Sequence, residues 1–356
     1  MTTKTVILGT GSIIPETLVP NSHFESNEFY DHGGARIERS GAEIVAKLEA
    51  ITGIQERRYI PSDQDSIQLM TDASRLAVSD AKLDVNELSG IIVAHNAGNM
   101  IPQTGAFHTV PNLAAALKNA LDCTNHGCFA YDLLFGCPGW LQGIIQAHQA
   151  IQCGDGRHIL VTGLEVASRM LDPHDVDSMI LADGCGACVV SRSDDATKGI
   201  ISYSTFSHGQ DDNRIIYLGE SNKKGVEGSC YFHMNGREVY KYATKWVPRV
   251  VKDALDKANI GIDEVDIFLF HQANAKMLDA IAKNLAELYE VSEDIFCGKI
   301  PSTIEFLGNT SVATIPTMLD LIMRERLDGF RIFEGQIAMM ASVGAGMHCN
   351  ALVYQF

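Results

Sequence analysis

The chain has 356 residues, of which 46% are hydrophobic and 20% are charged, as is typical of a globular protein with a large core. No apolar run reaches the roughly 18 residues that a membrane helix needs, and no signal-peptide pattern opens the chain, so we expect a cytoplasmic protein without a membrane partner. The formal net charge of −16 disfavours nucleic-acid binding, and nine cysteines without regular spacing favour reduced thiols over a disulfide framework.

The first expected element is a strand at the N-terminus, in the segment MTTKTVILGTGSIIP, which leads to a Gly-rich turn. The turn sequence GTGS lacks the rest of the GxGxxG dinucleotide fingerprint and its acidic partner. We therefore expect no dinucleotide and no other cofactor.

Four short, continuous apolar runs follow along the chain, at residues 91–94, 159–162, 267–270 and 337–340. Such runs are typical of strands that are buried on both faces, as in an α/β sheet covered by helices. Residues 20–63 and 204–231 are rich in Gly, Asn, Asp, Ser and Pro, so we expect long irregular segments there, as candidate binding loops.

A thiol lies where a strand meets a helix, in the segment YDLLFGCPGWLQGII at residues 131–145. Pro138 suits the first turn of a helix over 138–151, which places Cys137 near the N-cap. Free N–H groups and the helix dipole favour an anion there, so we expect a lowered pKa and a nucleophilic thiolate. Taken alone, a buried structural cysteine explains the same residue equally simply.

Two other cysteine patterns invite a metal interpretation. CGAC at residues 185–188 has the CxxC spacing, and CTNHGC at residues 123–128 combines two cysteines with a histidine. Neither pattern has a second ligand cluster, and CGAC lies in an apolar, strand-like stretch. We therefore expect no metal site.

A basic stripe interrupts the acidic background in the helix expected around residues 236–258. At 3.6 residues per turn, its five cations fall on one face of the helix. They are Arg237, Lys241, Lys245, Arg249 and Lys252. The stripe is either a solvated face or a docking surface for an acidic partner, and Arg57 and Arg58 are candidates to extend it.

Two polar side chains in the second half lie, like the thiol, where a strand ends or a helix begins. FLFHQAN at residues 268–274 places His271 where an apolar strand ends, and EFLGNTSVATIP at residues 305–316 places Asn309 before another helix. Polar groups at strand ends converge where two sheet-based halves meet. Cys137, His271 and Asn309 are therefore expected to share one cleft.

The chain carries the marks of an internal duplication. AVSDAKLDVNEL at residues 77–88 aligns without gaps with ALDKANIGIDEV at residues 254–265, and an apolar strand follows each copy. Further on, GDGRHILVTGLE at residues 154–165 resembles FEGQIAMMASVGAG at residues 333–346. We expect two related halves, at residues 1–200 with Cys137 and at residues 201–356 with His271 and Asn309.

Several motifs together resemble the ketoacyl synthase III enzymes of the thiolase superfamily. They are TGIQERRYI, YDLLFGCPGW, LADGCGACVV, MNGREVYKYA, HQANAKML, GNTSVATIP and SVGAGMHCNALV, in the family's order across nearly the whole chain. The resemblance implies a five-layered αβαβα fold built from two βαβαβαββ halves, which agrees with the duplication. It also implies a homodimer.

The chemistry that this resemblance implies is a Claisen condensation. Cys137 would take an acyl group from a thioester, and His271 and Asn309 would stabilise the enolate formed from a malonyl or β-ketoacyl thioester. The backbone N–H groups of Cys137 and Ala345 would form the oxyanion hole. The thioesters would be carried on CoA or on an acidic acyl carrier protein, which would dock beside the basic stripe.

Departures from the family pattern point to a specialised enzyme. AKLEAI at residues 46–51 has no aromatic residue where the enzymes that start fatty-acid synthesis carry a tryptophan that stacks on coenzyme A. A ketosynthase similar to the dialkylresorcinol-forming enzymes, which also cyclise their product, fits this difference. Two alternatives stay open: an acyltransferase that passes its acyl group to an alcohol or amine, and a non-catalytic partner subunit.

Overall fold

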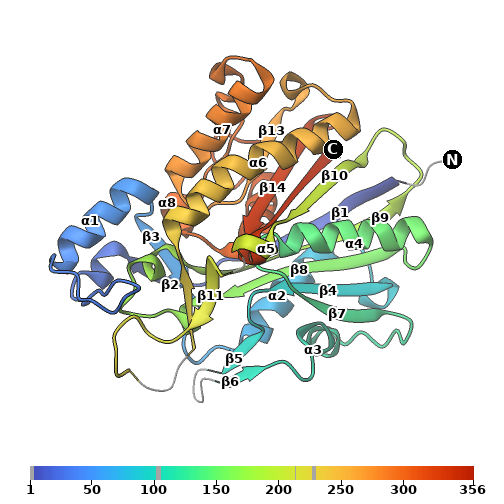
Figure 1. The fold of residues 1–356 in the computed structure, drawn as a ribbon. Helices are drawn as coiled ribbons and strands as arrows, with labels where there is room; N and C mark the ends of the chain where they lie inside the picture. Colours follow the sequence, from blue (N-terminus) through green and yellow to red (C-terminus); the bar gives the residue numbers. More distant parts are fainter. Residues whose placement is uncertain (1–3, 102–105, 213, 227–229) are drawn as a thin grey trace.

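The computed structural model describes residues 4–101, 106–212, 214–226 and 230–356, and it contains two large sheets (Figure 1). The first sheet has five strands in the order β1–β9–β8–β4–β7. Their bounds are Lys4–Ile13 (β1), Asp183–Ser193 (β9), His158–Val166 (β8), Gly90–His95 (β4) and Phe129–Leu134 (β7). β4 runs parallel to β7 and β8, whereas β9 is antiparallel to both of its neighbours.

The second sheet repeats this arrangement with four strands in the order β10–β15–β14–β13. Their bounds are Gly199–Ser207 (β10), His348–Gln355 (β15), Ile337–Gly344 (β14) and Ile267–Phe270 (β13). β13 and β14 are parallel, and β15 is antiparallel to both neighbours. The backbone N–H of Phe268 donates to the carbonyl of Lys299, at the edge where the first sheet carries β7. All four apolar runs expected to be strands are confirmed.

Helices form three layers around and between these sheets (Figure 1). Helices α2 (Ser66–Asp80) and α3 (Leu113–Ala120) cover the outer face of the first sheet. Helices α4 (Gly139–Cys153) and α9 (Thr314–Met323) lie between the two sheets, and α6 (Gly236–Ala258) and α7 (Ala275–Tyr289) cover the outer face of the second. Three apolar clusters fill the spaces between the layers. The expected αβαβα order is confirmed.

The duplication is visible in the order of elements. β1, α2, β4, α3, α4, β8 and β9 correspond to β10, α6, β13, α7, α9, β14 and β15 in chain order and in their place in the sheets. β9 ends at Ser193 and β10 begins at Gly199. The division into residues 1–200 and 201–356 as separate units stays a prediction.

Smaller elements surround the end of the molecule where the strands stop. They are β2 (Thr17–Pro20), α1 (Gly41–Thr52), β3 (Glu56–Tyr59), β5 (Asn99–Ile101), β6 (Ala106–His108), α5 (Gly209–Asp212), β11 (Ile216–Gly219), β12 (Tyr231–Met234) and α8 (Ile304–Leu307). The expectation of an irregular segment at 20–63 is wrong over α1, whose N-terminus has a capping box between Ser40 and Glu43. Residues 213 and 227–229 of the second stretch lie outside the described residues.

The expected turn at GTGS is also wrong, because β1 continues through it to Ile13. The glycines serve close packing instead. A Cβ atom on Gly11 would lie 2.4 Å from the carbonyl oxygen of Ala73 in α2, so the helix backbone lies directly on the strand. None of the described helices combines the length and the apolar character needed to cross a bilayer.

Candidate active site

Cys137 lies in the short connection between β7 and α4. Gly136 has a φ of +74°, a left-handed conformation that glycine adopts without strain, and Pro138 is the N-cap of α4. The turn is closed by a hydrogen bond from the N–H of Gly139 to the carbonyl of Gly136. The sulfur is thereby held at the carboxyl end of a parallel strand, the end at which open α/β sheets bind ligands.

The loop after β14 packs directly against this turn. A Cβ atom on Gly344 would lie 2.8 Å from the backbone nitrogen of Cys137, and one on Gly136 would lie 3.1 Å from that of Ala345. The backbone of Ala345, expected as a second oxyanion donor, therefore lies close to the backbone of Cys137. Glycine at both positions allows the two segments to approach this closely.

His271 and Asn309 are anchored by backbone hydrogen bonds on either side of the cleft. His271 directly follows β13, and its N–H donates to the carbonyl of Ala341 at 2.9 Å. The N–H of Asn309 donates to the carbonyl of Ile180 at 3.0 Å, which connects the second half to the first. The Asn309 Oδ1 accepts a 2.8 Å hydrogen bond from the N–H of Ser311, so the Nδ2 group is the one left to donate.

Cys137, His271 and Asn309 line one cavity of about 600 Å³. Most of the remaining lining is apolar, from α1, β11, β12, the first turns of α6 and α7, and the segment at 176–181. The sequence-based expectation that the three side chains share one cleft agrees with this arrangement.

Burial sets the protonation of the imidazole. It lowers the pKa of His271 to about 4, so the ring is neutral at physiological pH. The buried Nδ1 atom has no hydrogen-bond partner among the described residues. A neutral imidazole with an unengaged nitrogen suits a group that hydrogen-bonds a ligand.

Burial has the opposite consequence for the thiol. It raises the pKa of Cys137 to about 12, although a hydrogen bond from the Ser311 hydroxyl to the sulfur, at 3.2 Å, opposes the rise. The expectation of a lowered thiol pKa at the start of α4 is therefore wrong. Desolvation raises the thiol pKa by more than the hydrogen bonds from Ser311 and from the backbone lower it.

Family models match the two segments that hold these residues. The model for 3-oxoacyl-[acyl-carrier-protein (ACP)] synthase III matches residues 131–209, and the model for the C-terminal part of the same synthase matches residues 255–356. The beta-ketoacyl-[acyl-carrier-protein] synthase III of Porphyra purpurea is 32% identical over 359 residues, covering 98% of each chain. A synthase III from Vibrio vulnificus is 32% identical over 351 residues, covering 98% of this chain and 99% of the relative.

The chain belongs to the 3-oxoacyl-ACP synthase III family. It is a condensing ketosynthase. The synthase III structure from Aquifex aeolicus has a TM-score of 0.79 at 26% identity, covering 99% of this chain and 100% of that one. The priming β-ketosynthase of the R1128 polyketide pathway has a TM-score of 0.79 at 26% identity, covering 99% and 96%. Xanthomonas campestris OleA, at 16% identity and a TM-score of 0.78, shows the shared thiolase-like fold alone.

The mouth of the ketosynthase cavity is basic on one side. Arg237, at the start of α6, lines the cavity together with Arg39 and Lys47. The other four cations of the stripe continue along α6 away from it. Lys241 pairs with Glu238 at 2.6 Å and Lys252 pairs with Asp256 at 2.8 Å.

Lys245 and Arg249 lie over the ring of Trp246, at 4.7 and 5.5 Å from its centre. The expectation that Arg57 extends the stripe is wrong. Its side chain is fully buried and donates to the carbonyl of Val19 and to Asn21. Arg58 pairs with Glu56.

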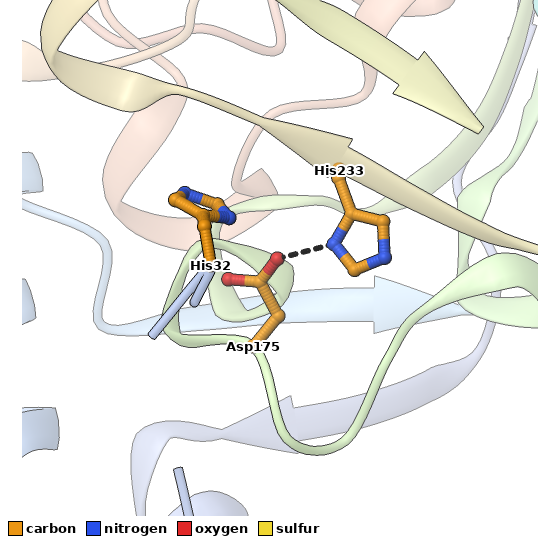
Figure 2. Close-up of side chains that lie close together, drawn as sticks. All are labelled: His32, Asp175 and His233. Carbon is orange, nitrogen blue, oxygen red and sulfur yellow. Dashed lines mark hydrogen bonds and ion pairs between the residues drawn. The ribbon is translucent and has the colours of Figure 1, made fainter. Parts of the chain in front are cut away.

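Two histidines and one carboxylate lie close together (Figure 2), and one of them, His32, lines the cavity. His233 from β12, Asp175 and the exposed His32 have potential ligand atoms within 4.8 Å of one another. His233 Nδ1 and Asp175 Oδ2 are 2.6 Å apart, which is a hydrogen-bond distance, whereas two ligand atoms on one tetrahedral Zn²⁺ ion lie about 3.4 Å apart. The geometry therefore favours an ion pair over a metal site.

Both nitrogens of His233 face acceptors, because Nε2 lies 2.8 Å from the carbonyl oxygen of Glu220. Burial by itself lowers the pKa of His233, but the hydrogen bond and the charge of Asp175, together with the Glu220 carbonyl and the charge of Asp172, raise the pKa above its ordinary value. The raised pKa favours the protonated ring, which donates from both nitrogens. The ring holds β12 against the segment that carries Asp175.

The CxxC pattern does not form a chelating pair. Cys185 and Cys188 both lie in β9, three residues apart, so their side chains point to opposite faces of the sheet. Cys185 packs in the outer cluster with α2 and Cys188 in the cluster between the sheets.

Sequence reasoning missed several residues around the cavity. α1 provides Ile44, Leu48 and Ile51 to its lining, and the capping box before this helix was the available signal. It also missed Glu165, Asn96 and Ser311, which form a largely buried group beside the sulfur. Ser311 lies in the GNTS motif, but nothing in the sequence pairs it with the other two.

Proposed function

We propose that Cys137 carries the acyl group of this ketosynthase as a thioester and that the cavity then admits a malonyl or β-ketoacyl thioester. Loss of CO₂ from malonyl, or transfer of an α-proton from a β-ketoacyl group to water, gives an enolate. The enolate carbon attacks the acyl carbonyl and displaces the Cys137 thiolate. The observation that carries this proposal is the shared cavity of Cys137, His271 and Asn309.

His271 and Asn309 are assigned to the enolate oxygen. A neutral imidazole donates a hydrogen bond without losing its proton, and the Asn309 Nδ2 group is left to donate because Oδ1 is already engaged. Donors aimed at a developing negative charge in a dry cavity contribute most to such reactions. The N–H groups of Cys137 and Ala345 are assigned to the tetrahedral oxyanion, on the strength of their close approach.

The five cations of α6 are assigned to docking of an acidic acyl carrier protein. The stripe begins at Arg237 on the rim of the cavity, so a carrier bound along α6 has its thioester arm beside the opening. The aliphatic lining contributed by α1 suits an acyl chain or a pantetheine arm. The acyl group can come from a thioester of the carrier protein or of CoA, and both are to be tested.

A homodimer is part of the proposal. β7 is the edge strand of the five-stranded sheet and is only half-buried along its length, whereas β4 beside it is fully buried. Leu134, at the end of β7, is 71% exposed. A second copy that covers this edge would satisfy its hydrogen-bonding groups and bury its apolar side chains.

The test is an intact-mass experiment with acyl-CoA and acyl-carrier thioesters, followed by addition of malonyl-carrier or β-ketoacyl-carrier. We expect an acyl adduct on Cys137 that disappears in Cys137→Ala, and a product with a new carbon–carbon bond when the second thioester is added. His271→Ala should keep the adduct and lower CO₂ release from malonyl on the order of 10²–10³-fold. His126→Ala is the control, because His126 is exposed and does not line the cavity, and it should leave CO₂ release unchanged.

Two results would contradict the proposal. The absence of any adduct would make the chain a non-catalytic partner subunit. An adduct that passes to an added alcohol or amine, with no carbon–carbon bond formed from either second thioester, would make it an acyltransferase on the same fold.

A further inference from the structure

A largely buried polar group contacts the sulfur of Cys137 without lining the cavity, and the proposed condensation does not use it. It consists of Ser311 at the start of a short 3₁₀ turn before α9, Asn96 after β4, and Glu165 in β8. Three separate elements therefore place polar side chains at one point beside Cys137.

Hydrogen bonds link the members of this group to one another and to the sulfur. The Ser311 hydroxyl donates to the sulfur of Cys137 at 3.2 Å. The Asn96 amide donates to the Ser311 oxygen at 2.6 Å and also to Oε2 of Glu165. The Ser311 hydroxyl lies within hydrogen-bonding reach of the Glu165 carboxylate as well. A proton on the sulfur is thus one hydroxyl away from a carboxylate.

Glu165 is 2% exposed, and none of the described lysines and arginines forms an ion pair with it. Burying a carboxylate without a cation is costly, so the group gains most from holding a proton part of the time. The neighbouring titratable groups are Cys137 and, on β9, Asp183. The Asp183 carboxylate accepts hydrogen bonds from the N–H groups of Ser168 and Ile60. The positive charge of Arg169 lowers the pKa of Asp183.

The backbone at Ser311 is held in an unfavourable conformation. Its φ is +48°, in the left-handed region that a residue with a Cβ rarely adopts. The same residue donates its N–H to Oδ1 of Asn309 and its hydroxyl to Cys137. Strain of this kind persists where the surroundings fix the backbone, often at functional sites.

The thiol needs a proton acceptor, since burial raises the pKa of Cys137 to about 12. His271, with a pKa of about 4, is a weak base. Burial raises the pKa of Glu165 to about 7, close to the value that suits a proton acceptor at neutral pH.

We infer that Glu165 takes up the proton of Cys137 through the Ser311 hydroxyl during acylation and returns it when condensation releases the thiolate. In acylation, the Ser311 hydroxyl turns its proton from the sulfur to the Glu165 carboxylate, and the thiol proton then moves to the Ser311 oxygen as the Ser311 proton moves to Glu165. The sulfur–acyl bond then forms, and the donor leaves as a thiolate that takes a proton from water. In condensation, the new carbon–carbon bond expels the Cys137 thiolate, which recovers the proton by the reverse route.

This inference rests on the proposed function for its place in the cycle, but its test does not need turnover. The rate of alkylation of Cys137 by iodoacetamide, followed by peptide mass, is measured from pH 5.5 to 9.5. In the unchanged protein we expect the rate to rise with pH and to level off above about pH 7, because Glu165 accepts the proton once it is ionised.

Glu165→Gln keeps the shape of the side chain and cannot accept the proton. We expect its rate at pH 7.5 to fall on the order of 10²-fold, with no inflection near pH 7 and a continued rise to high pH. The melting temperature should not fall, because a neutral amide is buried at lower cost than a carboxylate. Ser311→Ala, which breaks the connection, should lose the same inflection.

Thr310→Val is the matched control, since Thr310 is a buried neighbour whose hydroxyl bonds to Thr314 and not to the sulfur. Its profile should follow the unchanged protein. A Glu165→Gln profile that overlays the unchanged protein, or an equal change in Thr310→Val, would overturn the inference. If Glu165→Gln does not fold, a Ser311→Ala profile with the inflection intact would overturn it equally. A protein that forms no acyl adduct but shows the expected alkylation profile would contradict the proposed function alone.

Discussion

At the scale of single residues, burial decides the protonation states around the cavity. The same loss of water raises the pKa of Cys137 to about 12 and lowers that of His271 to about 4. Both groups are therefore neutral when no substrate is present. Nucleophilicity depends on what accepts the thiol proton, and not on the position of the sulfur before α4 alone.

The ion pair of His233 and Asp175 (Figure 2) leads to a prediction about stability and pH. The pKa of His233 is raised in the folded protein, so the stabilisation is fully present below the unfolded value of about 6.5 and is lost as pH rises through the folded value. His233→Gln should lower the free energy of unfolding at pH 6 by about 3–5 kcal/mol, since it leaves Asp175 buried without its cation.

Urea unfolding of both proteins from pH 5.5 to 9 measures this difference. It should shrink as pH rises. His126→Gln, at an exposed histidine, should match the unchanged protein at every pH. A difference for His233→Gln that stays constant or grows with pH would show that His233 is neutral in the fold.

At the scale of elements, α6 serves two surfaces at once. Its buried face packs on β10, β14 and β15, and its exposed face carries the basic stripe from the cavity rim outward. The spacing of the cations is readable along the chain, and the helix has the bounds expected for it. Where elements were missed or misjudged, as at α1 and through GTGS, composition suggested a loop or turn and packing decided otherwise.

The docking role of this stripe is tested by charge reversal. Lys245→Glu together with Arg249→Glu should lower kcat/KM with carrier-bound thioesters about tenfold, the effect of roughly 1.4 kcal/mol from two exposed cations of the stripe. Turnover with small soluble thioesters should be unchanged. The loss should diminish at high salt, because exposed charges are screened.

Lys257→Glu is the control for net charge. Lys257 lies in the last turn of α6, pairs with Asp253 and is off the stripe. It should leave carrier-dependent turnover unchanged. An equal loss with carrier-bound and small thioesters would place the defect in the cavity and refute docking along α6.

At the scale of the whole molecule, the two related halves pack through the helices between their sheets, and the cavity lies at the carboxyl ends of their parallel strands. The first half supplies Cys137 at the start of α4, and the second supplies His271 and Asn309. The backbone N–H of Asn309 donates to the carbonyl of Ile180 and its carbonyl accepts from the N–H of Ala182, so the two halves are connected at the cavity itself.

The exposed edge at β7 gives a prediction about assembly. Leu134→Asp places a charge on the edge that the proposed homodimer covers, and burial of an unpaired charge is costly. Size-exclusion chromatography with light scattering should show a dimer for the unchanged protein and a monomer for this variant. Phe333→Asp, at another exposed hydrophobic residue, should remain dimeric. A Leu134→Asp variant that stays dimeric would exclude this edge as the interface.

The sequence by itself determined the layered α/β fold, the duplication and the candidates Cys137, His271 and Asn309. These follow from local patterns: apolar runs, helical spacing and polar residues where strands end, each readable within a few residues of chain. The family motifs added the condensing chemistry, which the relatives bear out.

Only the tertiary structure decided the thiol's protonation, the burial of Arg57 and the group of Ser311, Asn96 and Glu165 beside the sulfur. Desolvation depends on every atom that surrounds a group, and those atoms come from segments up to 215 positions apart, as with Asn96 and Ser311. No local sequence pattern predicts contacts between residues so far apart in the chain, because the packing of one half against the other brings them together.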